Sequence, residues 1–170
     1  RALETTRKLE DFDVVWLEEP LLGSDFEGLS KLCRNTTVDI AGGEFNKGLP
    51  VFRRMLEEGV YDVLQPDANM SEGIFQLKKV AGMAESYNRW FEPHTWGNGL
   101  LLAASIHLAA SVPNCRYLEY PYDPPSFPLE SYYGMLEETI EIDDDGLVHV
   151  PQGPGIGVEL DRDAIEEYKV

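Results

Sequence analysis

Short apolar runs alternate along this chain with longer segments whose apolar residues recur every three or four positions. Runs of this length predict buried strands, and the second spacing predicts one face of an amphipathic helix. The runs are uniformly apolar, which is typical of strands that are covered on both faces of a parallel sheet. The pattern predicts strands near residues 14–17, 38–43, 63–66, 90–93 and 116–118, and helices over residues 24–35, 49–58, 74–84 and 98–112.

A polar residue capable of chemistry stands at the end of each predicted strand. These residues are Glu18, Glu44, Asp67, His94 and Glu119, and the steps between them are 26, 23, 27 and 25 residues. Each step is the length of one strand, one helix and two short loops. Repeating strand-helix units build a parallel sheet, so all five residues are expected on the same rim. The spacing therefore predicts one shared site.

Two folds contain such a repeat, the (β/α) barrel and the open, doubly wound sheet. An open sheet concentrates its site at the point where the strand order reverses, whereas a barrel presents a reactive group at any strand end. Because every predicted strand here ends in a reactive residue, we favour an α/β fold of the TIM-barrel type with about five βα units.

The length of the chain does not fit a complete barrel. Eight units take about 250 residues, but this chain has 170, and the repeat reaches only to about Tyr120. Arg1 lies within an uncapped helical segment that runs straight into the first strand. Five units alone would leave two unpaired edges that recruit other strands. We therefore expect the C-terminal part of a longer barrel, with the N-terminal half of the same chain missing, in a homo-oligomer. An intact, monomeric polypeptide of only these residues would contradict the barrel assignment.

The composition changes after Tyr120, which divides the chain into residues 1–120 and 121–170. The second part starts with a crossing rich in proline and tyrosine, which cannot continue a helix or a central strand. Alternating segments around an Asp-Gly turn predict a β-hairpin over residues 139–150. A glycine-rich loop and a short acidic helix from Asp161 form the tail. We expect this part to pack outside the barrel.

Acidic residues outnumber basic ones by 31 to 14, which gives a formal net charge of -17. This charge argues strongly against nucleic acid as a partner, because phosphates require Lys and Arg. The excess is typical either of an ordinary solvated surface or of adaptation to high salt. No apolar stretch reaches the roughly 18 residues that span a bilayer, so no membrane partner is expected. Cys33 and Cys115 suggest no disulfide framework, which favours a reducing, cytoplasmic setting.

Two pairs of residues on adjacent predicted strands carry distinct chemistry. Glu18 and Glu44 offer hard oxygen ligands that suit Mg²⁺, although two carboxylates are too few and a third from a preceding strand would complete the site. Asp67 and His94 form the next pair, in which a carboxylate bonded to one imidazole nitrogen fixes the tautomer and raises the basicity of the other. Glu119 closes the arc opposite the metal ligands.

Several short motifs carry a family resemblance when they are taken together. They are Trp16-Leu17-Glu18-Glu19-Pro20, Gly42-Gly43-Glu44, Gln65-Pro66-Asp67, Pro93-His94, Leu118-Glu119 and the tail Gly153-Pro154-Gly155-Ile156-Gly157. In this order and at this spacing, over residues 12–120, they resemble the second half of the enolase superfamily barrel. The resemblance is to the mandelate racemase and muconate lactonizing enzyme family and its acid-sugar dehydratases.

The resemblance implies a role for each of the five residues. Glu18 and Glu44 would be the second and third ligands of Mg²⁺. His94 would be the general base or acid, supported by Asp67, and Glu119 would hydrogen-bond the carboxylate or enolate of a small-molecule carboxylate substrate. By the same resemblance, the first metal ligand and a lysine base would lie before the first residue.

The expected activity is that of a Mg²⁺-dependent hydro-lyase that removes water from a sugar acid to give a 2-keto-3-deoxy acid. A racemase or epimerase of a 2-hydroxy acid, or a barrel with only a binding role, is the alternative. Glu19 is expected to support the site. His107, on an apolar helix, is expected to be a packing residue, and His149 a surface residue.

Overall fold

The computed structural model describes residues 1–167 and 169 and is centred on a parallel β-sheet. Within the described residues this sheet has four strands in the order β1-β2-β3-β4. The strands are β1 (Trp16–Glu18), β2 (Asp39–Gly42), β3 (Val63–Leu64) and β4 (Trp90–Phe91). Neighbouring strands are all parallel, with Leu17 opposite Ile40 and Ala41 opposite Val63. Their carboxyl ends therefore share one rim.

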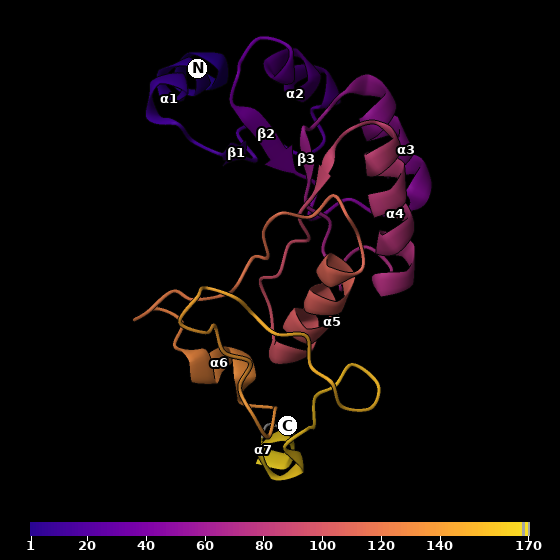
Figure 1. Ribbon diagram of the computed structural model, residues 1–170. Coiled ribbons are helices and arrows are strands. Elements are labelled where there is room, and N and C mark those ends of the chain that lie inside the picture. Colours follow the sequence, from indigo (N-terminus) through magenta and orange to yellow (C-terminus); the bar gives the residue numbers. More distant parts are fainter. Residues whose placement is uncertain (168, 170) are drawn as a thin grey trace.

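A helix follows each of these strands. The helices are α2 (Phe26–Cys33), α3 (Leu49–Glu58), α4 (Ile74–Ser86) and α5 (Gly99–Ala110), and α1 (Ala2–Leu9) with the short helix η1 (Glu10–Phe12) precedes β1. Figure 1 shows α2, α3 and α4 in succession along one side of the sheet. A sequential strand order with helices on one side is the wall of a barrel, since a doubly wound sheet has helices on both faces. The predicted α/β barrel-type fold and its helices are confirmed.

Local chemistry explains where the helices begin and end. The side chain of Asp25 accepts a hydrogen bond of 2.9 Å from the backbone N–H of Gly28 and so caps α2. Asn98 caps α5 in the same way, by accepting from two N–H groups of its first turn. Gly59, with φ of 64°, ends α3 in the left-handed conformation that glycine adopts at low cost.

No helix of residues 1–167 and 169 is long and apolar enough to cross a membrane.

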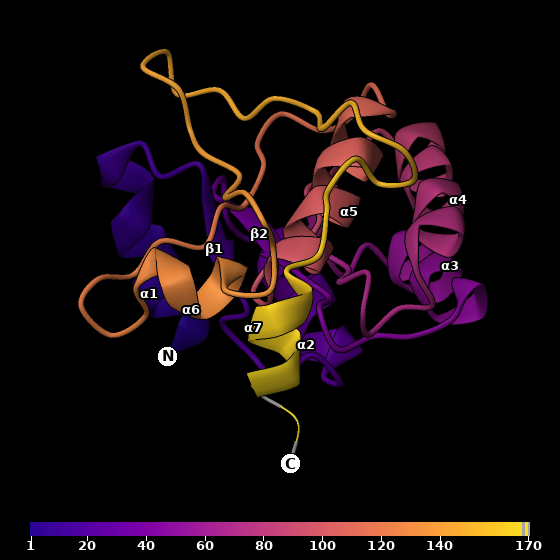
Figure 2. The same cartoon turned by 90° about the horizontal axis from the view of Figure 1, so that it is seen from below.

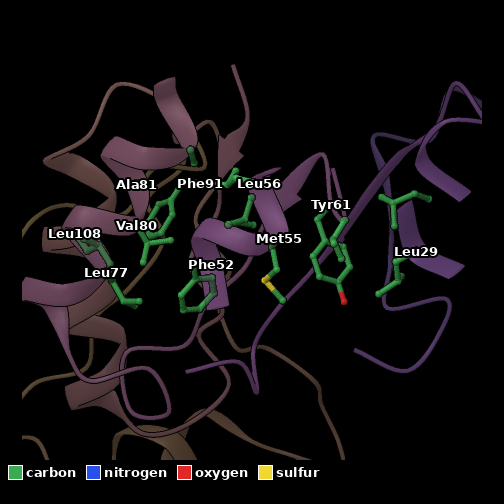
Figure 3. Close-up of a cluster of buried hydrophobic side chains, with 14 of the residues drawn as sticks. Leu29, Phe52, Met55, Leu56, Tyr61, Leu77, Val80, Ala81, Phe91 and Leu108 are labelled. Atoms are coloured by element: carbon green, nitrogen blue, oxygen red, sulfur yellow. The ribbon is translucent and has the colours of Figure 1, made fainter. Parts of the chain in front are cut away.

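The main hydrophobic core lies between the sheet and its helices (Figure 3). Alternate strand residues enter it from the sheet, among them Ile40, Leu64 and Phe91, which are at most 1% exposed. Phe52 of α3 and Leu77 of α4 meet them from the helices. Because side chains alternate between the two faces of a strand, the residues beside these ones point to the opposite face of the sheet.

A second core explains why α5 is apolar on nearly every face. Leu102, Ala103 and Ile106 of α5 pack against Tyr132 and Tyr133 of α6 (Leu129–Tyr133), while other residues of α5 belong to the main core. Figure 2 shows α6 and α7 (Arg162–Glu167) on the side of α5 away from α4. The segment after residue 120 therefore packs on α5. Its division from residues 1–120 as a separate domain stays a prediction.

Two predicted β-elements differ in the structure. Residues 116–118 are not a strand of the described sheet, and the side chain of Glu92 accepts hydrogen bonds from the backbone N–H groups of residues 116 and 117 instead. The predicted hairpin over residues 139–150 is reduced to a single antiparallel bridge between Ile142 and Val148. Its turn does form, since Asp143 accepts from the backbone N–H groups of Asp145 and Leu147.

Candidate active site

The five residues predicted at strand ends lie along the rim of the sheet. Glu18 is the last residue of β1, and Glu44 follows β2 after one glycine, Gly43. Asp67 and His94 stand three residues beyond β3 and β4 and are themselves joined by a parallel bridge. Glu119 reaches the loop after β4, where its Oε2 accepts a hydrogen bond of 2.5 Å from the backbone N–H of Thr95. The structure thus brings the predicted residues to one rim.

His94 lies between two carboxylates. Its Nδ1 is 2.8 Å from Oδ2 of Asp67, and its Nε2 is 2.5 Å from Oε2 of Glu44. Ionised carboxylates only accept hydrogen bonds, so this geometry suits a ring that carries hydrogen on both nitrogens. The pKa of His94 reflects this competition: burial lowers it, but the hydrogen bond to Asp67 and the charges of Glu119 and Glu44 outweigh burial and raise it. The arrangement favours the imidazolium.

Asp67 is held rigidly by its own loop. It is 3% exposed, and its Oδ1 accepts hydrogen bonds from the backbone N–H groups of Asn69, at 2.6 Å, and Met70, at 3.1 Å. The other oxygen, Oδ2, is therefore left for His94. A carboxylate that is fixed in this way orients the imidazole and stabilises its charge.

Glu44 lies among other acidic groups. Its pKa is raised, first by burial and then by the charges of Glu19, Glu18 and Glu119, while His94 acts in the opposite direction. The pKa of Glu119 is also raised, chiefly by burial, although the hydrogen bond from Thr95 opposes this shift. Negative charge is thus concentrated at this end of the sheet, and a cation would relieve it.

Gln65 was not singled out as a site residue from the sequence, but it contacts one. Its Nε2 donates a hydrogen bond of 3.0 Å to Oε2 of Glu18. Gln65 is only 4% exposed, and its Oε1 has no hydrogen-bond partner among the described residues. Its place in the motif Gln65-Pro66-Asp67, at the end of an apolar run, is a sequence signal that could have marked it. Glu19, with φ of 41°, supports the same region by accepting from the N–H of Gly43 at 3.4 Å.

The donor set can be compared with what Mg²⁺ requires. Glu18 and Glu44 offer hard carboxylate oxygens at the ends of neighbouring strands, and the charge of Glu18 is one of the causes of the raised pKa of Glu44. Within residues 1–167 and 169, no group of three or more His, Cys, Asp or Glu side chains is placed to hold a metal. The two glutamates fit Mg²⁺ in chemical type but supply only part of a ligand set.

The remaining histidines lie elsewhere. Nε2 of His107 is 3.1 Å from the backbone oxygen of Ile156, which joins α5 to the tail. His149 pairs with Asp143 on the surface, at 2.7 Å. Among the hydrogen bonds and ion pairs of the described residues, neither histidine has one of the five rim residues as a partner.

Comparison with known proteins decides the family. The family model of the enolase C-terminal domain-like proteins matches residues 1–164 of the chain. The chain belongs to this family. A mandelate racemase/muconate lactonizing enzyme from Sulfitobacter sp. superimposes with a TM-score of 0.86 at 30% identity, over 95% of this chain and 39% of that one. The enolase-type chain therefore corresponds to the C-terminal part of a barrel, as its motifs predict.

Curated relatives agree with this assignment. D-xylonate dehydratase from Haloferax volcanii is 32% identical over 99% of the chain and 40% of its own length. D-galactarolactone cycloisomerase from Agrobacterium fabrum is 28% identical over 94% of the chain and 43% of its own length. Other relatives are likewise named as dehydratases, of D-galactonate and D-gluconate. The chain spans about two fifths of the length of the curated relatives that it matches.

Proposed function

We propose that the whole protein is a Mg²⁺-dependent dehydratase of a sugar acid, which forms a 2-keto-3-deoxy acid. The observation that carries this proposal is His94, held between Asp67 and Glu44 at the shared rim of an enolase-type sheet. Relatives over nearly the whole chain are named as dehydratases of D-xylonate, D-galactonate and D-gluconate, which supports the same reaction and substrate class.

The reaction breaks two bonds of the substrate. The α-carbon loses its proton to a base, the β-hydroxyl takes up a proton from an acid and leaves as water, and the resulting enol gains a proton on the β-carbon and loses its hydroxyl proton to become the 2-keto acid. The α-proton of a carboxylate is very weakly acidic, so the site must stabilise the negative charge that develops. Bound Mg²⁺ would supply that stabilisation as a Lewis acid, with Glu18 and Glu44 among its ligands.

His94 would move the proton. In its charged form it can give the Nε2 proton to the departing β-hydroxyl, and in its neutral form it can take the α-proton. The contacts with two carboxylates favour the charged form and so support the acid role. Asp67 would keep the ring oriented in either role. The raised pKa of Glu119 suits a carboxyl group that donates a hydrogen bond to the substrate carboxylate or enolate.

The test uses the natural full-length protein with Mg²⁺ and a panel of sugar acids in D₂O. Formation of a keto acid supports dehydration. In His94→Asn, loss of the keto acid with retained deuterium exchange at the α-carbon would assign His94 as the acid, whereas loss of both would assign it as the base. Mg²⁺ affinity, measured by calorimetry, should persist in this variant. The matched control is His149→Asn, which changes an exposed histidine and should leave turnover intact. Undiminished keto-acid formation by His94→Asn would remove His94 from the mechanism.

A second candidate is an isomerase of a sugar acid, because D-galactarolactone cycloisomerase matches the same part of the chain. Isomerisation retains the water that a dehydratase removes. Deuterium exchange at the α-carbon without a keto-acid product would therefore favour this candidate. No exchange and no product with any acid of the panel would contradict both enzymatic proposals.

A further inference from the structure

The carboxylate of Glu92 accepts hydrogen bonds from more donor groups than any other carboxylate among the described side chains, although no motif contains this residue. It directly follows β4 and is 3% exposed. Its oxygens accept hydrogen bonds from the backbone N–H groups of Arg116, at 3.2 Å, and Tyr117, at 2.8 Å. They also lie 3.0 Å from Nε of Arg116 and 3.5 Å from the thiol of Cys115. A buried carboxylate is stable only with such partners.

These contacts replace a strand ladder. In a regular parallel pair, only alternate residues bond to a given neighbouring strand, so the N–H of residue 116 would bond to a carbonyl oxygen of β4. Here one backbone hydrogen bond joins the segment to β4, from the N–H of Phe91 to the oxygen of Asn114. Beyond this bond, the N–H groups of the segment donate to the side chain of Glu92. The side chain of Glu92 therefore fixes the path of the chain beyond residue 114.

Arg116 forms an ion pair with Glu92 and so compensates its charge. Its guanidinium lies over the ring of Trp90, 4.1 Å from the ring centroid, while Nε bonds to Glu92. A partly buried ion pair with further hydrogen bonds adds little net stability, but removal of one partner is costly. Such a pair is better suited to fixing a geometry than to stabilising the fold.

The geometry that it fixes leads into the site. Glu119 comes two residues after Tyr117, and its Oε2 meets the N–H of Thr95, three residues after Glu92. The two short segments are thus joined at both ends, by Glu92 at one and by Glu119 at the other. Glu18, Gln65, Glu92 and Glu119 line the same cavity, of about 380 Å³.

We infer that Glu92 is a positioning residue for Glu119. Glu92 holds the chain from residue 115 to 117 so that Glu119 reaches Thr95 beside His94. The placement of Glu119 does not depend on any activity. Only the kinetic consequence rests on the proposed function.

The first experiment measures amide hydrogen exchange by NMR in the natural full-length protein and in Glu92→Gln. The amide side chain keeps one acceptor but turns an N–H₂ group toward N–H donors. Exchange at Thr95, together with Arg116 and Tyr117, should rise about tenfold or more, as expected when a hydrogen bond to a charged group is lost. Unchanged protection of the Thr95 amide would overturn the inference.

Asp62→Asn is the matched control. Asp62 also forms a partly buried ion pair, at 2.5 Å to Arg89, and also accepts from a backbone N–H, that of Ile40. Its removal should weaken the fold without changing exchange at Thr95. Equal loss of Thr95 protection in both variants would mean that Glu92 acts only through global stability, against the inference. If Glu92→Gln does not fold, Glu92→Asp, which keeps the charge but shortens its reach, decides by the same readout.

The second experiment is a double-mutant cycle on kcat/KM with Glu92→Gln and Glu119→Gln. If Glu92 acts through Glu119, the double variant should be no slower than Glu119→Gln, within about twofold, because the positioned group is already lost. Multiplied losses would indicate an independent role and contradict the inference. If the full-length protein acts on no sugar acid, the proposed function fails, and exchange at Thr95 still decides the role of Glu92.

Discussion

Gly42 offers a sharp test of how the strand end before Glu44 is built. Its φ is 158°, in a region that residues with a side chain rarely adopt. A Cβ atom added there would lie 2.7 Å from Cε1 and 2.9 Å from the hydroxyl of Tyr61. Tyr61 is 1% exposed and belongs to the main core, so its ring has little room to move. Gly42→Ala should therefore strain both the backbone and the packing.

The expected magnitude follows from these two costs. A residue held in a sparsely populated backbone region loses about 1–3 kcal/mol, and overpacking of a core costs about 1–3 kcal/mol. Gly42→Ala should thus lower the free energy of unfolding by about 2–6 kcal/mol. The same substitution at Gly82 should do the opposite. Gly82 is exposed within α4, no described atom other than those of its chain neighbours and the nearby helix backbone lies within 4 Å of its added Cβ, and alanine there should stabilise by about 0.5–1 kcal/mol.

Urea-induced unfolding, followed by circular dichroism, measures both variants against the parent protein. The slope of the transition should stay the same while its midpoint moves in opposite directions. A Gly42→Ala protein as stable as the parent, within about 0.5 kcal/mol, would refute the packing of Tyr61 against this strand. A Gly82→Ala protein that loses stability would refute the exposed placement of that glycine.

Four further predictions concern stability and reactivity. Asn98→Ala should destabilise the protein by about 1 kcal/mol in urea unfolding, because two N–H groups of α5 lose their cap, whereas Asn98→Asp should not. Tyr61→Phe should be neutral or stabilising in the same assay, since the Tyr61 hydroxyl has no hydrogen-bond partner among the described residues. Burial raises the pKa of the Cys33 and Cys115 thiols to about 12, so iodoacetamide should label them at about pH 8 only in urea. Unfolded thiols ionise near about pH 8.5, so the unfolded state binds fewer protons above that value and stability should fall as the pH rises toward 12.

The repeat, the helices and the meeting of five rim residues were all predictable from the sequence. Apolar spacing fixes where helices and strands form, and the parallel topology then determines where the strand ends meet. The contact between Asp67 and His94 followed from this topology alone, since both residues stand three positions beyond neighbouring strands.

What escaped prediction depends on side-chain contacts across the sheet. The run before Glu119 has the composition of a strand, but Glu92 competes for its N–H groups, and no local pattern announces a bond over 24 residues. The hydrogen bond of Gln65 to Glu18 spans 47 residues and is equally invisible in the sequence. The close contact of His94 with Glu44 joins a predicted base to a predicted metal ligand, and only the coordinates place them together.

The acidic residues at the rim look alike in sequence, yet their surroundings give each a different capability. Asp67 has two backbone N–H groups on one oxygen and His94 on the other, so it can only orient and stabilise charge. Glu119 is half-buried with a single N–H donor, and its raised pKa favours a carboxyl that can donate. Glu44 lies among other carboxylates, which favours the approach of a cation or of charged His94. Environments that push the pKa values of neighbouring ionisable groups apart allow one site to contain an acid, a base and a ligand. If substitutions of Asp67, Glu119 and Glu44 had the same effect on deuterium exchange at the α-carbon and on Mg²⁺ affinity measured by calorimetry, that division of tasks would not hold.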